Sequence, residues 1–223
     1  VLASSLAVGS TVKLMEGGTA VEYLVVNQGI PSNSNLYDAS CDGTWLLRKD
    51  CHSNGRWNRL DENEYASSVI NTWLNGDFFN SLGSVEQSVI KQVKIPYCVG
   101  NLTSTINSGT NGLAVKAFLL GGYEVGFTID DDNTLPEDGA KLDYFILGTN
   151  GNTKRISYLD GDAVYWWLRS PQWRTVNLVF HVKAAGGLTN QNPTRSKDGI
   201  RPALVLPGNA RFDETTMLLK GVI

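Results

Sequence analysis

The sequence predicts an α+β fold in one domain, with mixed or antiparallel sheets, two helices and long connecting loops. Hydrophobic residues make up 42% of the 223 residues, which is enough to bury a sizeable core. Short runs rich in β-branched residues recur between turn residues, as is typical of strands. Two segments with helical spacing of apolar residues follow one another, and no Pro-rich linker separates the two halves of the chain.

A β-hairpin is predicted near the beginning of the chain. Residues 11–14 and 21–26 are strand-like runs, and turn residues at 16–18 lie between them. The segment 32–40 is rich in Ser and Asn and is predicted as a loop. Residues 44–47 then have the apolar character of a strand.

Two amphipathic helices are predicted next. Asp61 and Glu64 have the spacing of a capping box ahead of an apolar stripe at 69, 70, 73 and 74, which ends at Gly76. A Ser-x-x-Gln pair starting at residue 84 repeats this spacing ahead of a second stripe that extends to residue 93, and Pro96 closes that helix. Each helix is expected to lay its stripe on a sheet.

Polar loops and short apolar elements alternate in the middle of the chain. Surface loops are predicted at 101–111 and 130–139. Short apolar elements are predicted at 117–120, 141–146 and 155–159. We expect a single ligand-binding domain over residues 1–207, followed by a C-terminal extension at 208–223.

Two strand-like blocks near the C-terminus enclose a tract of different character. The blocks are Tyr165-Trp166-Trp167-Leu168-Arg169-Ser170-Pro171 and Gly199-Ile200-Arg201-Pro202-Ala203-Leu204-Val205-Leu206. The tract between them, residues 172–198, is called the rim tract below, and it includes a strand-like run at 178–183 turned by Gly186 and Gly187. Its varied side chains include no set suited to acid–base or nucleophilic catalysis, so they favour binding.

Four residues of these blocks are assigned a structural role: Trp166, Trp167, Arg169 and Arg201. Aromatic residues on strands are usually core, and a buried guanidinium must be paired and hydrogen-bonded. The expected partners of the two arginines are carbonyl groups or a carboxylate, of which Glu124, Asp160 and Asp162 are the candidates.

The two blocks resemble a family of bacterial and phage domains of unknown function with a C-type-lectin-like fold. The motifs that carry the resemblance are Trp-Trp-Leu-Arg-Ser-Pro and Gly-Ile-Arg-Pro-Ala-Leu, with supporting matches at 20–26, 43–49, 122–127 and 154–156. The resemblance covers nearly the whole chain and implies the C-type-lectin-like fold. Some members resemble phage tail-associated proteins, and others the variable proteins of diversity-generating retroelements, whose ligand-contacting residues are rewritten at adenines.

The resemblance implies a non-enzymatic recognition domain that displays the rim tract to a cell-surface protein or glycan. Trp173 follows Pro171 among polar neighbours and is the first candidate for an exposed anchor. The full set of candidate ligand-binding residues is Gln172, Trp173, Arg174, Thr175, Val176, Asn177, His181, Lys183, Ala184, Thr189, Asn190, Gln191, Asn192, Thr194 and Arg195.

Other partners and locations follow from charge and hydropathy. The net charge is −3 and the Lys and Arg residues are scattered, so no nucleic-acid partner is expected. The sequence has neither a run of about 18 apolar residues nor the pattern of a signal peptide, so we expect no membrane insertion. We expect a phage virion (tail) or bacterial protein made in the cytoplasm. A homo-oligomer, such as a trimer on a virion, is an open alternative for its oligomeric state.

No cofactor and no metal site is predicted. The three cysteines, Cys41, Cys51 and Cys98, lack zinc-ligand spacing and are expected to be free thiols, with a Cys41–Cys51 bridge as an open alternative. The acidic residues at 130–132 offer oxygen ligands for calcium, but an acidic solvated turn is the preferred interpretation.

Two alternative functions stay open. One is an enzyme that acts on a glycan or a cell-wall component, with Asp160 and Asp162 in a cleft. The other is a virion structural or assembly module. Cys51 and His52 are a weak nucleophile–base pair, because adjacent residues of a strand point to opposite faces.

Overall fold

Strands predominate in the structure, a computed structural model that describes residues 1–32, 35–128 and 132–223. The fold is α+β, and almost all strand pairs are antiparallel. The strands are β1 Thr11–Glu16, β2 Thr19–Gln28, β3 Thr44–Arg48, β4 Ser53–Asn54, β5 Val93–Ile95, β6 Tyr97–Gly100, β7 Thr103–Asn107, β8 Leu113–Val115, β9 Ser157–Leu159, β10 Asp162–Val164, β11 Trp166–Pro171, β12 Val179–Val182, β13 Leu188–Gln191, β14 Gly199–Ile200, β15 Ala203–Leu206, β16 Ala210–Phe212 and β17 Leu219–Val222. The α-helices are α1 Val69–Trp73, α2 Phe79–Ser81, α3 Ser84–Val89 and α4 Asn152–Arg155.

Two sheets organise the domain. The first has the strand order β1-β2-β3-β15 and includes the hairpin predicted at 11–26, which is confirmed. The second has the order β13-β12-β11-β14-β4 and contains both strands of the predicted rim hairpin. The two blocks of sequence supply one strand to each sheet: β11 is the middle strand of the second sheet, β15 is the last strand of the first, and both are buried along their whole length.

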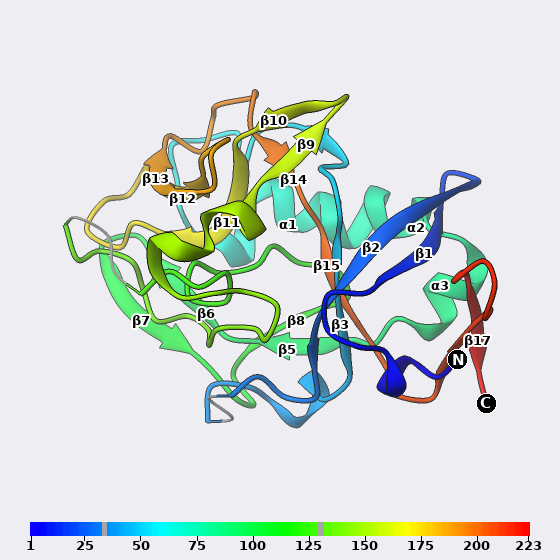
Figure 1. Ribbon diagram of the computed structural model, residues 1–223. Coiled ribbons are helices and arrows are strands. Elements are labelled where there is room, and N and C mark those ends of the chain that lie inside the picture. The colour runs from blue at the N-terminus through cyan, green and yellow to red at the C-terminus, as the bar shows by residue number, and fades with distance from the viewer. Residues whose placement is uncertain (33–34, 129–131) are drawn as a thin grey trace.

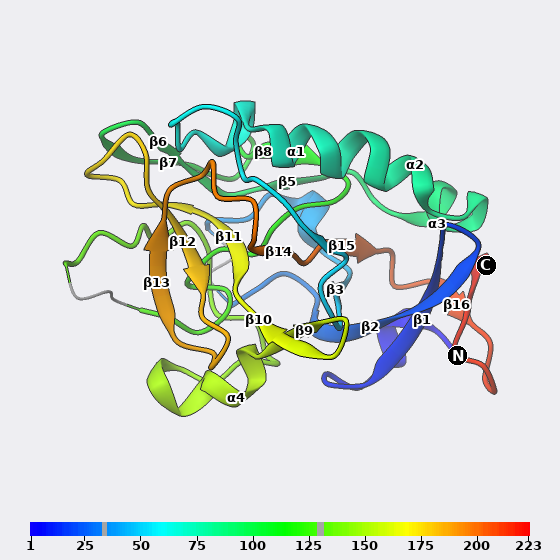
Figure 2. The same cartoon turned by 90° about the horizontal axis from the view of Figure 1, so that it is seen from above.

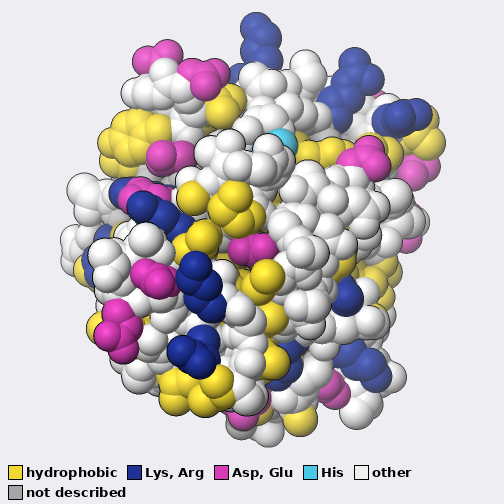
Figure 3. Space-filling model, turned by 90° about the vertical axis from the view of Figure 1, so that its right-hand side faces the viewer, with side chains coloured by type: hydrophobic (Ala, Val, Ile, Leu, Met, Phe, Trp, Pro, Cys, Tyr) yellow, Lys and Arg dark blue, Asp and Glu magenta, His cyan; other side chains and the backbone are white. Residues whose placement is uncertain are grey.

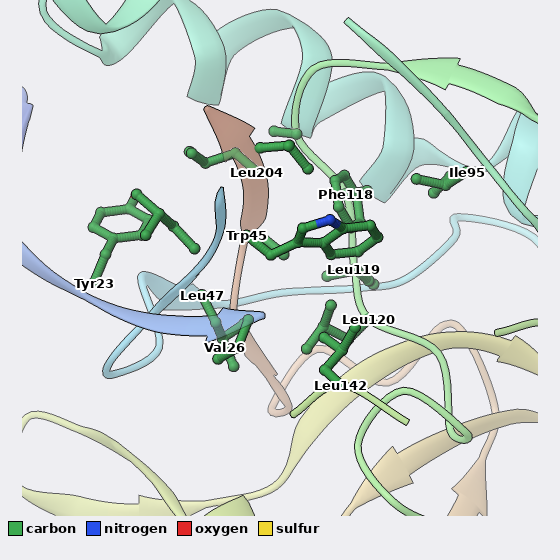
Figure 4. Packing of buried hydrophobic residues seen from close by; sticks show 14 of the residues in the cluster. Tyr23, Val26, Trp45, Leu47, Ile95, Phe118, Leu119, Leu120, Leu142 and Leu204 are labelled. Carbon is green, nitrogen blue, oxygen red and sulfur yellow. The ribbon is translucent and has the colours of Figure 1, made fainter. Parts of the chain in front are cut away.

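The main core lies against the first sheet and centres on Trp45 of β3 (Figure 4). Its ring meets Tyr37 and Phe118 edge to face, with centroid distances of 5.7 and 5.4 Å. The indole N–H donates to the carbonyl of Cys41 at 2.9 Å, so the only polar atom of this ring is satisfied. Leu204 of β15 and Leu119 complete the apolar surroundings shown in Figure 4.

The first predicted helix is present, but both of its predicted ends are wrong. Ser68, not Asp61, caps it, because the Ser68 hydroxyl accepts from the backbone N–H of Asn71 at 3.2 Å. The helix also continues past Gly76 through a π-helical segment, Leu74–Phe78, into α2. Burial of Leu74 and Phe78 outweighs the weak helix propensity of a single glycine.

The second predicted helix is shorter than expected. It covers Ser84–Val89, and the residue before it is Gly83, which provides no side-chain cap. The amide of Gln87 donates to the carbonyl of Leu82 at 2.7 Å. Val93, expected on the helix, lies in β5 and pairs with β8, so tertiary pairing replaces the last predicted turn. The further helix α4 was not predicted.

The expected surface loop at 101–111 is wrong, because β6 and β7 form a hairpin there. Asn101 and Leu102 both have positive φ, 53° and 66°, as in the two-residue turns that join antiparallel strands. Asn is common at such positions and Leu is not, so only the first of the two turn residues indicated a hairpin in the sequence.

The predicted surface loop at 130–139 is largely buried where the structure describes it. Of the residues considered for calcium, Asp130 and Asp131 lie outside the described residues and Asp132 is exposed, whereas Thr134, Leu135 and Asp138 are buried. Of the short apolar elements, 155–159 contains β9, but 117–120 makes only an isolated bridge from Phe118 to Ala203 and 141–146 is not a strand.

The rim hairpin and the chain ends lie at opposite ends of the molecule. In Figures 1 and 2 the stretch from α1 to α3 runs along one side of the first sheet, and β12 and β13 lie far from both termini. Residues 208–223, expected as an extension, pair as β16 and β17 and contribute Ala210, Phe212 and Leu219 to the core. On the side that carries the termini, charges of both signs are interspersed with apolar side chains (Figure 3).

All three cysteines are free and buried, so the alternative of a Cys41–Cys51 bridge is wrong. The Cys41 thiol donates to the carbonyl of Lys94 at 3.2 Å. Burial raises the pKa of Cys41 and of Cys98 to about 12, which keeps both thiols protonated and unreactive. Within the described ranges, no helix has the length and apolar character needed to cross a membrane.

Candidate functional site

The rim tract forms a loop, a hairpin and a second loop at the exposed end of the second sheet (Figure 2). In the hairpin, Phe180 pairs with Asn190 and His181 with Thr189. The backbone N–H of Lys183 donates to the carbonyl of Gly187 at 2.7 Å and closes the turn. Loops 172–178 and 192–198 flank this hairpin, so the expected display surface is one continuous structural unit.

Asn63 anchors the first of these loops. Its side-chain nitrogen lies 2.9–3.2 Å from the carbonyl oxygens of Gln172, Thr175 and Leu178, and its side-chain oxygen accepts from the backbone N–H of Asn101 at 2.8 Å. The side chain is completely buried. Sequence reasoning missed this residue, because an Asn in the polar stretch 61–65 gives no sign that it will be enclosed.

Arg155 anchors the hairpin turn. Its Nε donates to the carbonyl of Gly186 at 2.8 Å, and its Nη1 donates to the carbonyl of Val125 at 3.0 Å. The guanidinium also lies 3.9 Å from the ring centroid of Phe127. Burial lowers the pKa of this guanidinium to about 10, so it stays charged at neutral pH. The only signal in the sequence was its place in the block 154–156.

The second loop is held by a third group of anchors. The backbone N–H groups of Trp57 and Asn58 both donate to the carbonyl of Pro193, at 2.9 and 3.0 Å. The N–H of Gly55 donates to the carbonyl of Asp198 at 3.0 Å. The scaffold therefore holds all three parts of the rim tract by their backbone carbonyls.

Most of the candidate ligand-binding side chains reach solvent. Arg174, Val176, Lys183 and Arg195 are exposed. Those that are half-buried are Trp173, Thr175, Asn177, Ala184, Thr189, Asn190, Gln191, Asn192 and Thr194.

Gln172 and His181 are buried, so the expectation that both are displayed is wrong. Gln172 is 8% exposed, and its backbone N–H donates to the carbonyl of Leu178, which draws the residue into the base of its loop. His181 is 2% exposed. It lies on the inward face of β12, where its ring stacks on Trp167 at a centroid distance of 5.5 Å.

Trp173 is a partly covered anchor. The guanidinium of Arg174 lies 4.8 Å from its ring centroid, and this arginine also donates to the carbonyl of Asp132 at 3.4 Å. The pair offers an aromatic ring and a cation side by side, a combination common at recognition surfaces.

Asn192 and Thr194 shape the second loop. The side-chain oxygen of Asn192 accepts from the N–H and the hydroxyl of Thr194 at 2.9 and 2.6 Å, and its side-chain nitrogen donates to Asp61 at 2.9 Å. These bonds use much of the hydrogen-bonding capacity of both side chains. Asn192 and Thr194 therefore stabilise the loop as well as reaching solvent.

Two hollows flank the hairpin, one on each face. Phe180 and His181 are neighbours in β12 and so point to opposite faces. The hollow on the Phe180 face, called the β13 groove, has a volume of about 620 Å³ and is also lined by Phe127, Asn152 and Leu188. The hollow on the His181 face, called the His181 pocket, has a volume of about 280 Å³.

Arg169 has the structural role that was predicted, with Glu124 as its carboxylate partner. Its two terminal nitrogens donate to the two Glu124 oxygens at 2.5 and 2.9 Å. The remaining donors reach the carbonyls of Pro96, Leu119 and Asp138 at 2.7–3.0 Å, so the whole guanidinium is satisfied. Tyr37, whose ring packs on Trp45 of β3, donates to Glu124 at 2.9 Å.

Arg201, Trp166 and Trp167 are also buried, as predicted. Arg201 donates to the carbonyls of Arg48 and Lys49, both at 2.8 Å, and its guanidinium lies 4.9 Å from the Trp166 ring centroid. Trp167 donates from its indole N–H to the carbonyl of Gly55 at 2.9 Å. These bonds connect β11 to the residue that follows β4, and the segment after β14 to the end of β3 in the first sheet.

The residues weighed for catalysis are not brought together. Asp160 and Asp162 are exposed on the β9–β10 hairpin. Cys51 is buried against Ser157, while His52 packs on Trp73 and Phe78. Burial lowers the pKa of His52 and raises that of Cys51. In the part of the chain that the structure describes, no three His, Cys, Asp or Glu side chains gather as a set of metal ligands.

Comparison with known proteins gives one match. A family model described as a domain of unknown function (DUF6273) matches residues 42–208, a span that contains both sequence blocks and the whole rim tract. No curated protein and no solved structure matches the chain.

Proposed function

The chain belongs to the DUF6273 family of domains of unknown function, and we propose that it is a non-enzymatic recognition domain that binds a cell-surface ligand through the side chains of the rim tract. One observation carries the proposal. Asn63, Arg155 and the N–H groups of residues 55, 57 and 58 hold the tract by its backbone carbonyls. Exposed rim side chains such as Val176 and Lys183 can therefore vary without releasing the loops from the scaffold.

A loop that is held by its backbone and presents its side chains to solvent is suited to recognition. Backbone anchors keep the loops in one conformation, so a ligand meets a surface that is already ordered and binding costs little conformational entropy. The tract offers an aromatic–cation pair, the half-buried Trp173 with the exposed Arg174, and the exposed long cations Lys183 and Arg195. Such side chains commonly dominate binding energy at interfaces.

The finer assignments belong to the same proposal. The fold is C-type-lectin-like, which the antiparallel sheets, the long loops and the central position of the Trp-Trp-Leu-Arg-Ser-Pro block support. The setting is a phage tail or a retroelement-diversified protein. The rim lies opposite the chain ends (Figure 1), so a neighbour attached at either end would leave the rim accessible.

Binding to intact bacterial cells tests the proposal. The labelled domain is compared with two variants, one with Arg174, Val176 and Asn177 changed to Ala, and one with Lys183 and Arg195 changed to Ala. We expect at least one of them to lose cell binding while its free energy of unfolding stays within the range of surface substitutions, about 0.5 kcal/mol per site.

A matched control carries Arg211→Ala and Lys220→Ala, two exposed cations near the chain ends. It should bind as the unchanged domain does. If both rim variants bind cells normally, or if the control loses binding to the same extent, the rim tract is not the recognition surface.

A further inference from the structure

The His181 pocket contains a buried histidine whose orientation is set by the protein. Nδ1 of His181 lies 2.6 Å from Oδ2 of Asp198, and the ring lies between Trp167 and Tyr165 at centroid distances of 5.5 and 5.1 Å. Among the described residues, no protein group bonds the other ring nitrogen, Nε2. The ring lines the pocket, so Nε2 is the polar atom that a bound group would satisfy.

Asp198 also orients a cationic side chain at this pocket, Arg195. Its Oδ1 accepts from Nε of Arg195 at 2.9 Å, while its own side chain is 1% exposed. Only Nε of Arg195 is used within the described ranges, so both terminal nitrogens are left for a ligand. A guanidinium with two free terminal nitrogens matches the two oxygens of a carboxylate.

The net charge of the pocket favours a monoanion. Lys183 and Arg195 both line the pocket. Among the described residues no carboxylate forms an ion pair with Lys183, whereas Arg195 pairs with Asp198. Asp198 offsets one of these two cations, which leaves a net charge of one. A carboxylate carries one negative charge, whereas a phosphate monoester carries close to two at neutral pH.

The remaining lining fits a sugar ring. Tyr165 is 37% exposed and offers an aromatic face, and Thr189, Asn190 and Gln191 supply a hydroxyl and two amides. The volume of about 280 Å³ lies just below the range of pockets for drug-sized ligands, so it admits one sugar unit.

We propose that the His181 pocket binds an acidic sugar whose carboxylate is held by Arg195 and Lys183, with a sugar hydroxyl donating to Nε2 of His181 and the sugar ring beside Tyr165. This inference rests on the proposed recognition function and specifies its ligand class. It also explains why a residue of the rim tract is buried, since His181 forms the floor of the pocket.

Titration calorimetry with three probes tests the inference. Glucuronate supplies the sugar and the charge, glucuronamide supplies the sugar without the charge, and N-acetylaspartate supplies carboxylates without the sugar. We expect glucuronate to bind at least 10-fold more tightly than either of the others. A lost charge-assisted hydrogen bond is worth about 1.5–3 kcal/mol, which is a factor of 10 or more in Kd.

Variants locate the site. Arg195→Gln and Lys183→Gln should each raise the Kd for glucuronate about 10-fold or more, and amide shifts on glucuronate binding should centre on residues 189–191. The matched control is Lys197→Gln, an exposed lysine of the same tract that does not line the pocket. It should leave the Kd unchanged.

Equal binding of glucuronamide or N-acetylaspartate, or a Kd that neither pocket variant changes, overturns the inference. Its failure is separable from failure of the proposed function. Cell binding that depends on Arg174, Val176 and Asn177 without any glucuronate binding removes only the sugar assignment. Glucuronate binding in the pocket without cell binding removes only the cell-surface function.

Discussion

Arg169 and Glu124 form a two-bond ion pair in which neither side chain has exposed surface. Removal of one member leaves the other charge buried and unpaired, which costs about 3–5 kcal/mol. We expect Arg169→Met to lower the free energy of unfolding, measured by urea denaturation, by an amount in this range, or to prevent folding. Arg211→Met, at an exposed arginine, is the control. An Arg169→Met protein with a normal midpoint would show that the pair is not needed for stability.

Asn63 should control the order of the rim more than global stability. Asn63→Ala removes the donor that three loop carbonyls share. The carbonyls of Gln172 and Leu178 keep a backbone N–H donor, so the loss falls mainly on the Thr175 carbonyl, at a cost of about 1–3 kcal/mol. We expect hydrogen exchange to accelerate mainly in residues 172–178. Asn80→Ala, at an exposed helical position, should leave that exchange unchanged. Uniform acceleration across both sheets would instead assign Asn63 to the general core.

Asp138 should make stability fall as pH rises from about 4 to about 6. Burial is the main cause that raises the pKa of this carboxyl from 3.8 to about 6. The folded state then holds a proton that the unfolded state loses first, so its stabilising effect is present below pH 4 and lost above pH 6. The expected change is on the order of 3 kcal/mol.

Comparison with Asp138→Asn isolates this effect, because the amide has no charge and still accepts from the Ser170 hydroxyl, which lies 2.9 Å from both Asp138 oxygens. The difference in unfolding free energy between the two proteins should vary between pH 4 and 6 and be flat above pH 7. A constant difference across this window would mean that Asp138 ionises normally.

Two adjacent glycines of the hairpin turn should respond differently to alanine. Gly186 has a φ of +86°, and a Cβ there would lie 1.9 Å from the carbonyl oxygen of Asn152. At Gly187 the nearest atom to a Cβ is a side-chain carbon of Lys183 at 3.7 Å. We expect Gly186→Ala to destabilise by about 1–3 kcal/mol or more and Gly187→Ala by under 1 kcal/mol, measured by thermal unfolding. Equal effects would contradict the crowding at Gly186.

Local patterns in the sequence were enough to predict several strands. The hairpin at 11–26 has two strand-like runs and a Gly-Gly turn within a few residues of one another. The runs at 45–47 and 203–206 are apolar, and both lie in buried strands of the first sheet, β3 and β15. The structural roles of Arg169 and Arg201 were also predictable, because a charged residue inside an apolar block must find buried partners.

The sequence by itself therefore determined the α+β class, the central strands and the position of the rim tract between two buried blocks. Only the tertiary structure decided which residues hold the rim and which reach solvent. Asn63 and Arg155 act on carbonyls 109 and 31 residues away, and His181 is buried because Asp198 and Trp167 meet it from other segments. Burial of a polar side chain depends on partners that are distant along the chain, and these partners cannot be identified from the local sequence.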